Sequence, residues 1–201
     1  MGIEDVFGDL PVLETTRLVL RKMTLDDAGD MFEYARDPEV AKYVTWDAHR
    51  TIDDTLAFLR SVHQRYREGK IASWGMEYKL HSRLIGTCGF VSWKPRHNRA
   101  EIGYALSRAY WGKGVMTEAV REVIRFGFEQ MKLNRIEARC KVQNLSSERV
   151  MQKVGMRFEG ILREVVFDKG EYHDLKLYSI LKNEYWPGAR MDGLASTSLC
   201  R

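Results

Sequence analysis

The chain has 201 residues, of which 44% are hydrophobic and 30% are charged, and it carries a formal net charge of +4. This composition excludes intrinsically disordered, collagen-like and disulfide-scaffold proteins, and the length favours one domain with a sizeable core. The longest apolar stretches, such as residues 123–128, are far shorter than a membrane-spanning helix requires.

The first third of the chain is predicted to be mainly helical. From residue 16 to residue 69 we expect one strand and three helices, over residues 16–23, 24–37, 39–43 and 51–69. Thr24 with Asp27, and Thr51 with Asp54, have the spacing of helix capping boxes. Apolar residues then recur at helical spacing behind each cap, which predicts two amphipathic helices.

From residue 71 onward the hydrophobic period changes to two, which is typical of strands. We expect three antiparallel strands, a helix, a strand, a helix and a final hairpin, over residues 71–79, 83–94, 99–107, 114–132, 134–142, 146–153, 156–167 and 172–181. The helical connection between the strands at 99–107 and 134–142 implies a parallel neighbour there, unlike the rest of the sheet.

Residues 111–119, with the sequence WGKGVMTEA, connect a strand to the N-terminus of an amphipathic helix. Such a turn presents backbone N–H groups at the positive end of the helix dipole, which suits a phosphate. A Walker A loop would need Ser or Thr at Gly114, and a dinucleotide fingerprint would need a glycine at Thr117, so both nucleotide motifs fail. A plain turn that uses glycine for positive φ is the alternative.

The same loop resembles the acetyl-CoA pyrophosphate loop of the GNAT superfamily, Gln/Arg-x-x-Gly-x-Gly/Ala, with Trp111 and Met116 as departures. Both departures resemble the RimJ/RimL-type branch, in which W-G-K-G-x-[AM]-T-E-A is familiar. Four further segments match the order and spacing of that branch: 15-TTRLVLR-21, 101-EIGYALS-107, 134-NRIEARCKVQNLSSERVMQKVGMRFEG-160 and 172-YHDLKLYSIL-181.

This resemblance implies an α+β GNAT fold. Its sheet is expected to be mixed, mostly antiparallel and seven-stranded, to splay between the fourth and fifth strands, and to carry helices on both faces. The resemblance covers residues 13–186, which we expect to form a single acetyltransferase domain. Residues 1–12 are then an N-terminal extension and residues 187–201 a flexible C-terminal tail.

The implied activity is the transfer of an acetyl group from acetyl-CoA to a primary amine. In the family, backbone N–H groups of the loop hold the pyrophosphate, and the backbone of the splayed fourth strand pairs with pantetheine and supplies an oxyanion donor near Tyr104. The cofactor-binding residues expected on this basis are Ile102, Tyr104, Ala105, Leu106, Trp111, Gly112, Lys113, Gly114, Val115, Met116, Thr117 and Asn144.

Two polar residues follow the fifth predicted strand. Asn144 lies where the family places an asparagine that holds the pantetheine arm, and a helix N-cap is the alternative role. Ser147 matches the serine of the N-x-x-S pattern of the branch, which is proposed there to protonate or hydrogen-bond the departing thiolate. A capping hydroxyl is the alternative for Ser147.

Glu101 on the fourth strand is the expected general base, because a carboxylate at that position often relays a proton in GNAT enzymes. An exposed strand position is the alternative reading. The branch sometimes places a glutamate near the position of Val166, and this chain lacks that glutamate. Glu164 is a possible substitute, but the period of the strand does not say which face meets the substrate.

The acceptor amine is predicted from chemistry as well as from the resemblance. A protein N-terminal amine with a pKa of ~7.7–8.0 is partly neutral near pH 7.4, whereas a lysine amine at ~10.4 is almost wholly charged, so a weak base suffices for the N-terminus. We therefore expect a protein N-terminal α-amine, of the ribosomal-protein type. A small amine, such as a polyamine, amino acid or antibiotic, is the enzymatic alternative, and a non-catalytic CoA-binding module is the alternative of another class.

Other partners are not indicated. The five histidines have no metal-ligand spacing, and Cys88, Cys140 and Cys200 are too widely spaced for a zinc site or a disulfide framework, so we expect no metal and a reducing cytoplasm. The acidic N-terminus predicts neither export nor a lipid anchor. No basic block predicts nucleic-acid binding, no segment predicts membrane insertion, and homodimerisation is common in the branch.

Overall fold

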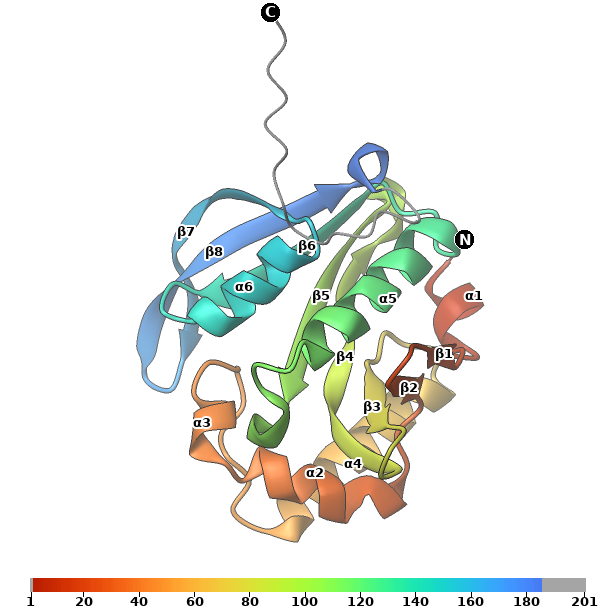
Figure 1. Ribbon diagram of the computed structural model, residues 1–201, viewed down its shortest axis with the longest axis vertical. Helices are drawn as coiled ribbons and strands as arrows, with labels where there is room; N and C mark the ends of the chain where they lie inside the picture. The colour runs from red at the N-terminus through yellow and green to blue at the C-terminus, as the bar shows by residue number, and fades with distance from the viewer. Residues whose placement is uncertain (1, 186–201) are drawn as a thin grey trace, which may run out of the picture.

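Eight strands form one sheet in the computed structural model, which describes residues 2–185 (Figure 1). They are β1 (Leu13–Glu14), β2 (Leu18–Arg21), β3 (Trp74–Tyr78), β4 (Arg83–Lys94), β5 (Arg99–Leu106), β6 (Arg135–Lys141), β7 (Arg157–Asp168) and β8 (Glu171–Leu181). Their order in the sheet is β1-β2-β3-β4-β5-β6-β8-β7. Every pair is antiparallel except β5 with β6, which is parallel, so the expected mixed α+β sheet is confirmed.

Helices cover the sheet from both sides (Figure 1). They are α1 (Ile3–Phe7), α2 (Ala28–Ala35), α3 (Pro38–Ala41), α4 (Ile52–Arg67), α5 (Val115–Glu129) and α6 (Leu145–Lys153), with 3₁₀ turns η1 (Leu25–Asp27), η2 (Pro95–His97), η3 (Arg108–Tyr110) and η4 (Lys182–Glu184). In Figure 1, α5 and α6 lie in front of the sheet, whereas α4 lies behind β3 and β4. None of the described helices is long and apolar enough to cross a membrane.

Two short N-terminal elements were not predicted from the sequence. The seven-strand count is one too low, because Leu13–Glu14 pairs with β2 and adds an eighth strand that is too short to show a period. The expected extension at residues 1–12 contains α1, whose Phe7 is buried with its ring 6.3 Å from that of Trp93. The domain end at residue 186 and the tail at 187–201 lie outside the described residues.

The parallel strands β5 and β6 stay together for only part of their length. Residues 99–102 of β5 pair with residues 135–138 of β6, and the pairing then stops. β4 remains paired with β5 as far as Leu106, while β8 remains paired with β6 as far as Lys141. The sheet therefore divides between β5 and β6, which are the fourth and fifth predicted strands, and leaves one edge of β5 open beyond Ile102.

Candidate functional site

The loop after β5 turns sharply into α5. Gly112 and Gly114 both have a φ of 73°, in the left-handed region that glycine adopts without strain. A Cβ atom at Gly112 would meet nothing within 4 Å, and one at Gly114 would meet only Nη2 of Arg17, at 3.8 Å. The loop is therefore open on the side where a ligand would approach.

Backbone amides gather at this loop without partners. The first helical hydrogen bond of α5 runs from the Glu118 amide to the Gly114 carbonyl, 3.1 Å away, and the described residues offer no partner to the amides of residues 112–117. They lie at the positive end of a 15-residue helix. Free N–H groups at such a helix terminus form an anion site that suits a pyrophosphate.

Arg17, in the connection between β1 and β2, holds this loop in place. Its guanidinium donates to the Lys113 carbonyl at 2.9 Å and to Glu118 Oε2 at 2.6 Å. Glu118 also accepts from the Arg17 amide at 2.8 Å and from the Thr15 hydroxyl at 2.6 Å. Burial opposes ionisation of Glu118, but these donors outweigh it and lower the pKa of its carboxyl. The loop thus has a fixed shape and an arginine beside it.

The open edge of β5 begins after Ile102, which is still paired with Ala138. Tyr104, Ala105 and Leu106 have β4 on one side and no strand on the other. Trp111 lies at the start of the loop and donates its indole N–H to the Leu106 carbonyl at 2.8 Å. This hydrogen bond ties the start of the loop to the end of β5, so the open strand edge and the loop amides lie next to each other.

Asn144 and Ser147 lie together at the N-terminus of α6. The Asn144 side chain accepts from the Ser147 amide at 3.1 Å, so Asn144 caps the helix. This hydrogen bond is the one expected for the helix N-cap role, the alternative considered for Asn144. Ser147 directs its hydroxyl elsewhere: Oγ lies 2.9 Å from the Tyr104 hydroxyl of β5.

Glu101 lies near the base of the division between β5 and β6, and its side chain is 23% exposed. Burial raises the pKa of its carboxyl, and the Arg139 guanidinium, 3.7 Å away, partly opposes this effect. Glu137 adds a smaller upward influence. A carboxylate whose pKa is raised in this way is a better proton acceptor than a fully solvated one.

The β7–β8 hairpin extends toward α3 (Figure 1). Its turn residue Lys169 donates to the Ala41 and Val44 carbonyls, and the preceding Asp168 pairs with Lys141 at 2.9 Å and His173 at 2.7 Å. Glu164, the substitute base considered from the sequence, is exposed at an irregularity of β7, and its φ is 48°.

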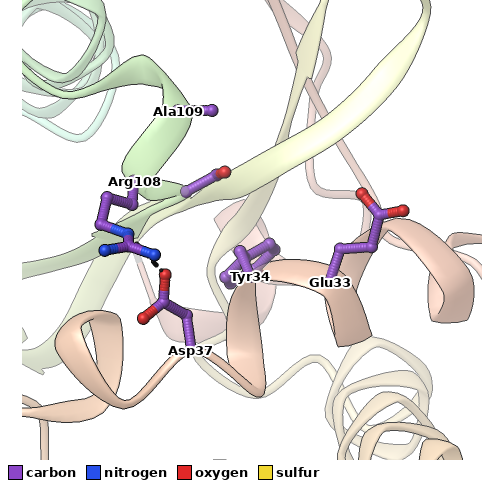
Figure 2. A pocket seen from close by; sticks show the side chains of 6 residues that line it. Glu33, Tyr34, Asp37, Arg108 and Ala109 are labelled. Carbon is purple, nitrogen blue, oxygen red and sulfur yellow. Dashed lines mark ion pairs between the residues drawn. The ribbon is translucent and has the colours of Figure 1, made fainter.

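A pocket of about 380 Å³ lies between the end of α2 and the turn η3, next to the C-terminal end of β5. Figure 2 shows the ion pair that crosses it, in which Arg108 Nε lies 2.8 Å from Asp37 Oδ2. A larger groove, of about 710 Å³, extends from Gly114 along α5 to Tyr185 and includes Arg17, Arg121 and Lys153. Within residues 2–185, no cluster of three or more His, Cys, Asp or Glu side chains could hold a metal ion.

Three contacts of this site were not predicted from the sequence. The roles of Arg17 at the loop and Arg139 beside Glu101 were missed, although Arg17 stands in the segment 15-TTRLVLR-21. The hydroxyl contact between Tyr104 and Ser147 joins residues 43 positions apart. Tertiary packing of β5 and α6 brings Tyr104 and Ser147 together, and no local sequence pattern predicts that packing.

Comparison with known proteins gives consistent results. Residues 17–157 match the model of the acetyltransferase (GNAT) domain family. The chain is 37% identical over 176 residues to an uncharacterized N-acetyltransferase, p20, of Bacillus licheniformis, over 88% of this chain and 99% of that protein. It is 32% identical over 96 residues to the ribosomal-protein-serine acetyltransferase of Escherichia coli, over 48% of this chain and 54% of that protein. The crystal structure of a GNAT-family acetyltransferase from Bacillus anthracis matches with a TM-score of 0.77 and 30% identity, over 86% of this chain and 99% of that chain.

Proposed function

The chain belongs to the GNAT acetyltransferase family, and from this premise we propose that its acceptor is the α-amine of a protein N-terminus. The protein is an acetyl-CoA-dependent N-acetyltransferase. The acceptor class and the roles of individual residues are the proposed part. Acetyl-CoA supplies an activated acetyl group as a thioester, and the residues of this chain bind it, orient it and move protons.

The observation that carries the proposed acetyl-CoA site is the set of unpartnered amides at residues 112–117, next to the open edge of β5. A pyrophosphate accepts hydrogen bonds from these amides, and the Arg17 guanidinium, paired with Glu118, holds the loop at the Lys113 carbonyl. The pantetheine amides then pair with the free edge of β5 at Tyr104, Ala105 and Leu106. The groove that starts at Gly114 gives the nucleotide end room along α5.

Glu101 and Ser147 divide the proton transfers in this proposal. Glu101 accepts, through water, the proton that the amine loses as its nitrogen bonds to the acetyl carbon. A backbone N–H of β5 near Tyr104 stabilises the negative charge on the acetyl oxygen. Ser147 donates its hydroxyl proton toward the sulfur as the carbon–sulfur bond breaks.

Two arguments support a protein N-terminus as the acceptor. An α-amine with a pKa of ~7.7–8.0 is partly neutral at physiological pH, so a single half-buried carboxylate such as Glu101 is a sufficient base. The Escherichia coli relative is named for acetylation of a serine in a ribosomal protein, and about half of this chain aligns with it. A lysine amine, at ~10.4, would require a stronger base or surroundings that lower its pKa.

The test is thiol release from acetyl-CoA against three acceptor sets: peptides beginning with Ser, Ala or Met, polyamines, and amino-acid analogues. The matched control for each peptide is the same sequence with a formylated N-terminus. Turnover with free but not blocked peptides is the expected result. Turnover confined to polyamines or amino-acid analogues would overturn the acceptor assignment, and calorimetry that detects no CoA binding would overturn the assigned CoA site.

A further inference from the structure

The Tyr104 side chain crosses from β5 to α6 at the place where the sheet has divided. Its hydroxyl lies 2.9 Å from Ser147 Oγ and 3.2 Å from the Ser147 carbonyl oxygen. Among the described residues, these are the side-chain hydrogen bonds that connect β5 to α6. Tyr104 lies two residues beyond Ile102, where β5 has lost its pairing with β6. The contact is therefore part of the site itself.

Either hydroxyl can donate the shorter hydrogen bond. Ser147 lies in the first turn of α6, where one lone pair of its carbonyl accepts the helical hydrogen bond from four residues on, and the tyrosine hydroxyl lies 3.2 Å from this oxygen. The tyrosine has one proton to donate, and Ser147 Oγ is the nearer acceptor. When Tyr104 donates to Oγ, the serine hydroxyl proton is left free for another acceptor.

The surroundings of Tyr104 keep its hydroxyl protonated. Burial raises the pKa of its phenol well above the usual value, and a hydrogen bond with Ser147 opposes this effect only partly. Burial, with Glu148 nearby, raises the pKa of the Cys140 thiol to about 11. Neither group ionises near neutral pH, so Tyr104 acts as a hydrogen-bond donor and keeps its own proton.

We propose that Tyr104 is a positioning residue for the departure of the thiol: by donating to Ser147 Oγ, it directs the serine proton toward the sulfur. This inference rests on the proposed function. The carbon–nitrogen bond forms, the carbon–sulfur bond breaks, and the sulfur leaves with the electron pair as a thiolate that accepts a hydrogen bond from the Ser147 hydroxyl. The amine nitrogen loses one proton, which Glu101 accepts through water, so atoms and charge balance. The positive end of α6 stabilises negative charge near Ser147 throughout.

The first test measures the pKa of the CoA thiol when CoA is bound, from the ultraviolet absorbance of the thiolate during a pH titration. In the native enzyme this pKa is expected below that of free CoA, because Ser147 donates to the thiolate. Tyr104→Phe is expected to raise it toward the value for free CoA while leaving the CoA affinity within about twofold. Tyr178→Phe is the matched control, since the Tyr178 hydroxyl also bonds to α6, at Glu148 (2.6 Å), but not to Ser147.

The second test is a double-mutant cycle on turnover. Tyr104→Phe is expected to lower kcat about tenfold with little change in KM, as loss of one hydrogen bond made in the transition state does. In a Ser147→Ala background the same change is expected to have no further effect on kcat, and Tyr178→Phe keeps kcat within about twofold.

The results distinguish this inference from the function on which it rests. CoA binding with an unshifted thiol pKa, or a Tyr104→Phe effect that persists undiminished without Ser147, refutes the positioning role alone. Absence of CoA binding in calorimetry refutes the assigned CoA site, and the positioning role with it. Thermal unfolding of each variant, with and without CoA, shows that the compared proteins are folded.

Discussion

Glu101 combines partial burial with a single, loose ion pair to Arg139, and this environment makes it the best-placed base of the site. Burial raises the pKa of its carboxyl, so Glu101 ionises at higher pH than a solvated glutamate. A base must be deprotonated to act. The rate therefore falls as the pH drops through the pKa of Glu101, and it falls earlier where the acceptor α-amine itself becomes protonated, near pH ~7.7–8.0.

Replacement of this carboxylate tests its role directly. Glu101→Gln is expected to lower kcat by about a hundredfold and to remove the more acidic of the two ionisations from the pH profile of kcat/KM. Glu159→Gln is the matched control, because Arg135 holds that carboxylate in a surface ion pair and lowers its pKa to about 2. If Glu101→Gln has the kcat and pH profile of the native enzyme, the proton leaves by another route.

Gly114 allows the loop to be tested by charge alone. Its φ of 73° disfavours most side chains, but Asn and Asp tolerate this region and have nearly the same shape. Gly114→Asp places a negative charge where two phosphates are proposed to bind, which costs about 1–4 kcal/mol at about 4 Å. We expect calorimetry to show CoA binding at least about tenfold weaker in Gly114→Asp than in Gly114→Asn. Equal affinity in the two variants would exclude this loop as the phosphate site.

At the scale of elements, the N-terminus of α5 is held by the β1–β2 connection through Glu118. Glu118 accepts three hydrogen bonds, from the Thr15 hydroxyl, the Arg17 amide and Arg17 Nε, and the Arg17 guanidinium donates a fourth to the Lys113 carbonyl. Glu118→Gln keeps the size of the side chain but removes the charge that Arg17 pairs with. It is expected to cost about 1–3 kcal/mol of the free energy of unfolding and to raise the KM for acetyl-CoA.

Chemical denaturation and initial-rate kinetics measure these two effects. Glu33→Gln is the control, because its ion pair with Arg83 is largely exposed and contributes less than about 1 kcal/mol. The pKa of Glu118 is lowered in the folded state, so its contribution is present above the unfolded pKa and is lost as the pH falls through the folded value. A Glu118→Gln enzyme with native stability at pH 7 would contradict the holding role.

The long helices were predictable from sequence because each has a recognisable N-terminal residue pattern and a helical period of apolar residues. The Thr51 cap and the Gly112–Gly114 turn locate the starts of α4 and α5 to within a residue or two of the structure. The two-residue strand β1 and the five-residue helix α1 are too short for any period to appear. The division between β5 and β6 came from the family resemblance, since residues 99–107 have the same alternation before and after the strands separate.

The candidate site was predictable as a backbone pattern but not as a set of side-chain contacts. Glycine spacing located the anion loop because positive φ and free amides follow from local sequence. The Tyr104–Ser147 contact depends on where α6 lies relative to β5, and the Arg17–Glu118 pair joins residues 101 positions apart. Such contacts arise from tertiary packing, so a single sequence shows the residues but not their partners.

At the scale of the whole molecule, α1 is part of the core and not an appendage. Phe7 is 1% exposed and packs against Trp93 of β4, while Trp74 of β3 donates its indole N–H to the Pro11 carbonyl at 2.6 Å. Residues 2–11 thus contribute Phe7 and the Pro11 carbonyl to packing against β4 and β3.

This packing predicts a large cost for a substitution far from the loop. Phe7→Ala is expected to lower the free energy of unfolding by about 3–5 kcal/mol, as removal of a buried aromatic ring does. The KM for acetyl-CoA should stay near the native value below the unfolding transition, since the Phe7 ring packs against Trp93 of β4 and the proposed phosphate contacts are backbone amides of residues 112–117. Val12→Ala, at a side chain that is 60% exposed, is the control and should change stability by less than about 0.5 kcal/mol. Equal denaturation midpoints for the two variants would show that the N-terminal segment contributes nothing to the core, and the domain would then begin at β1.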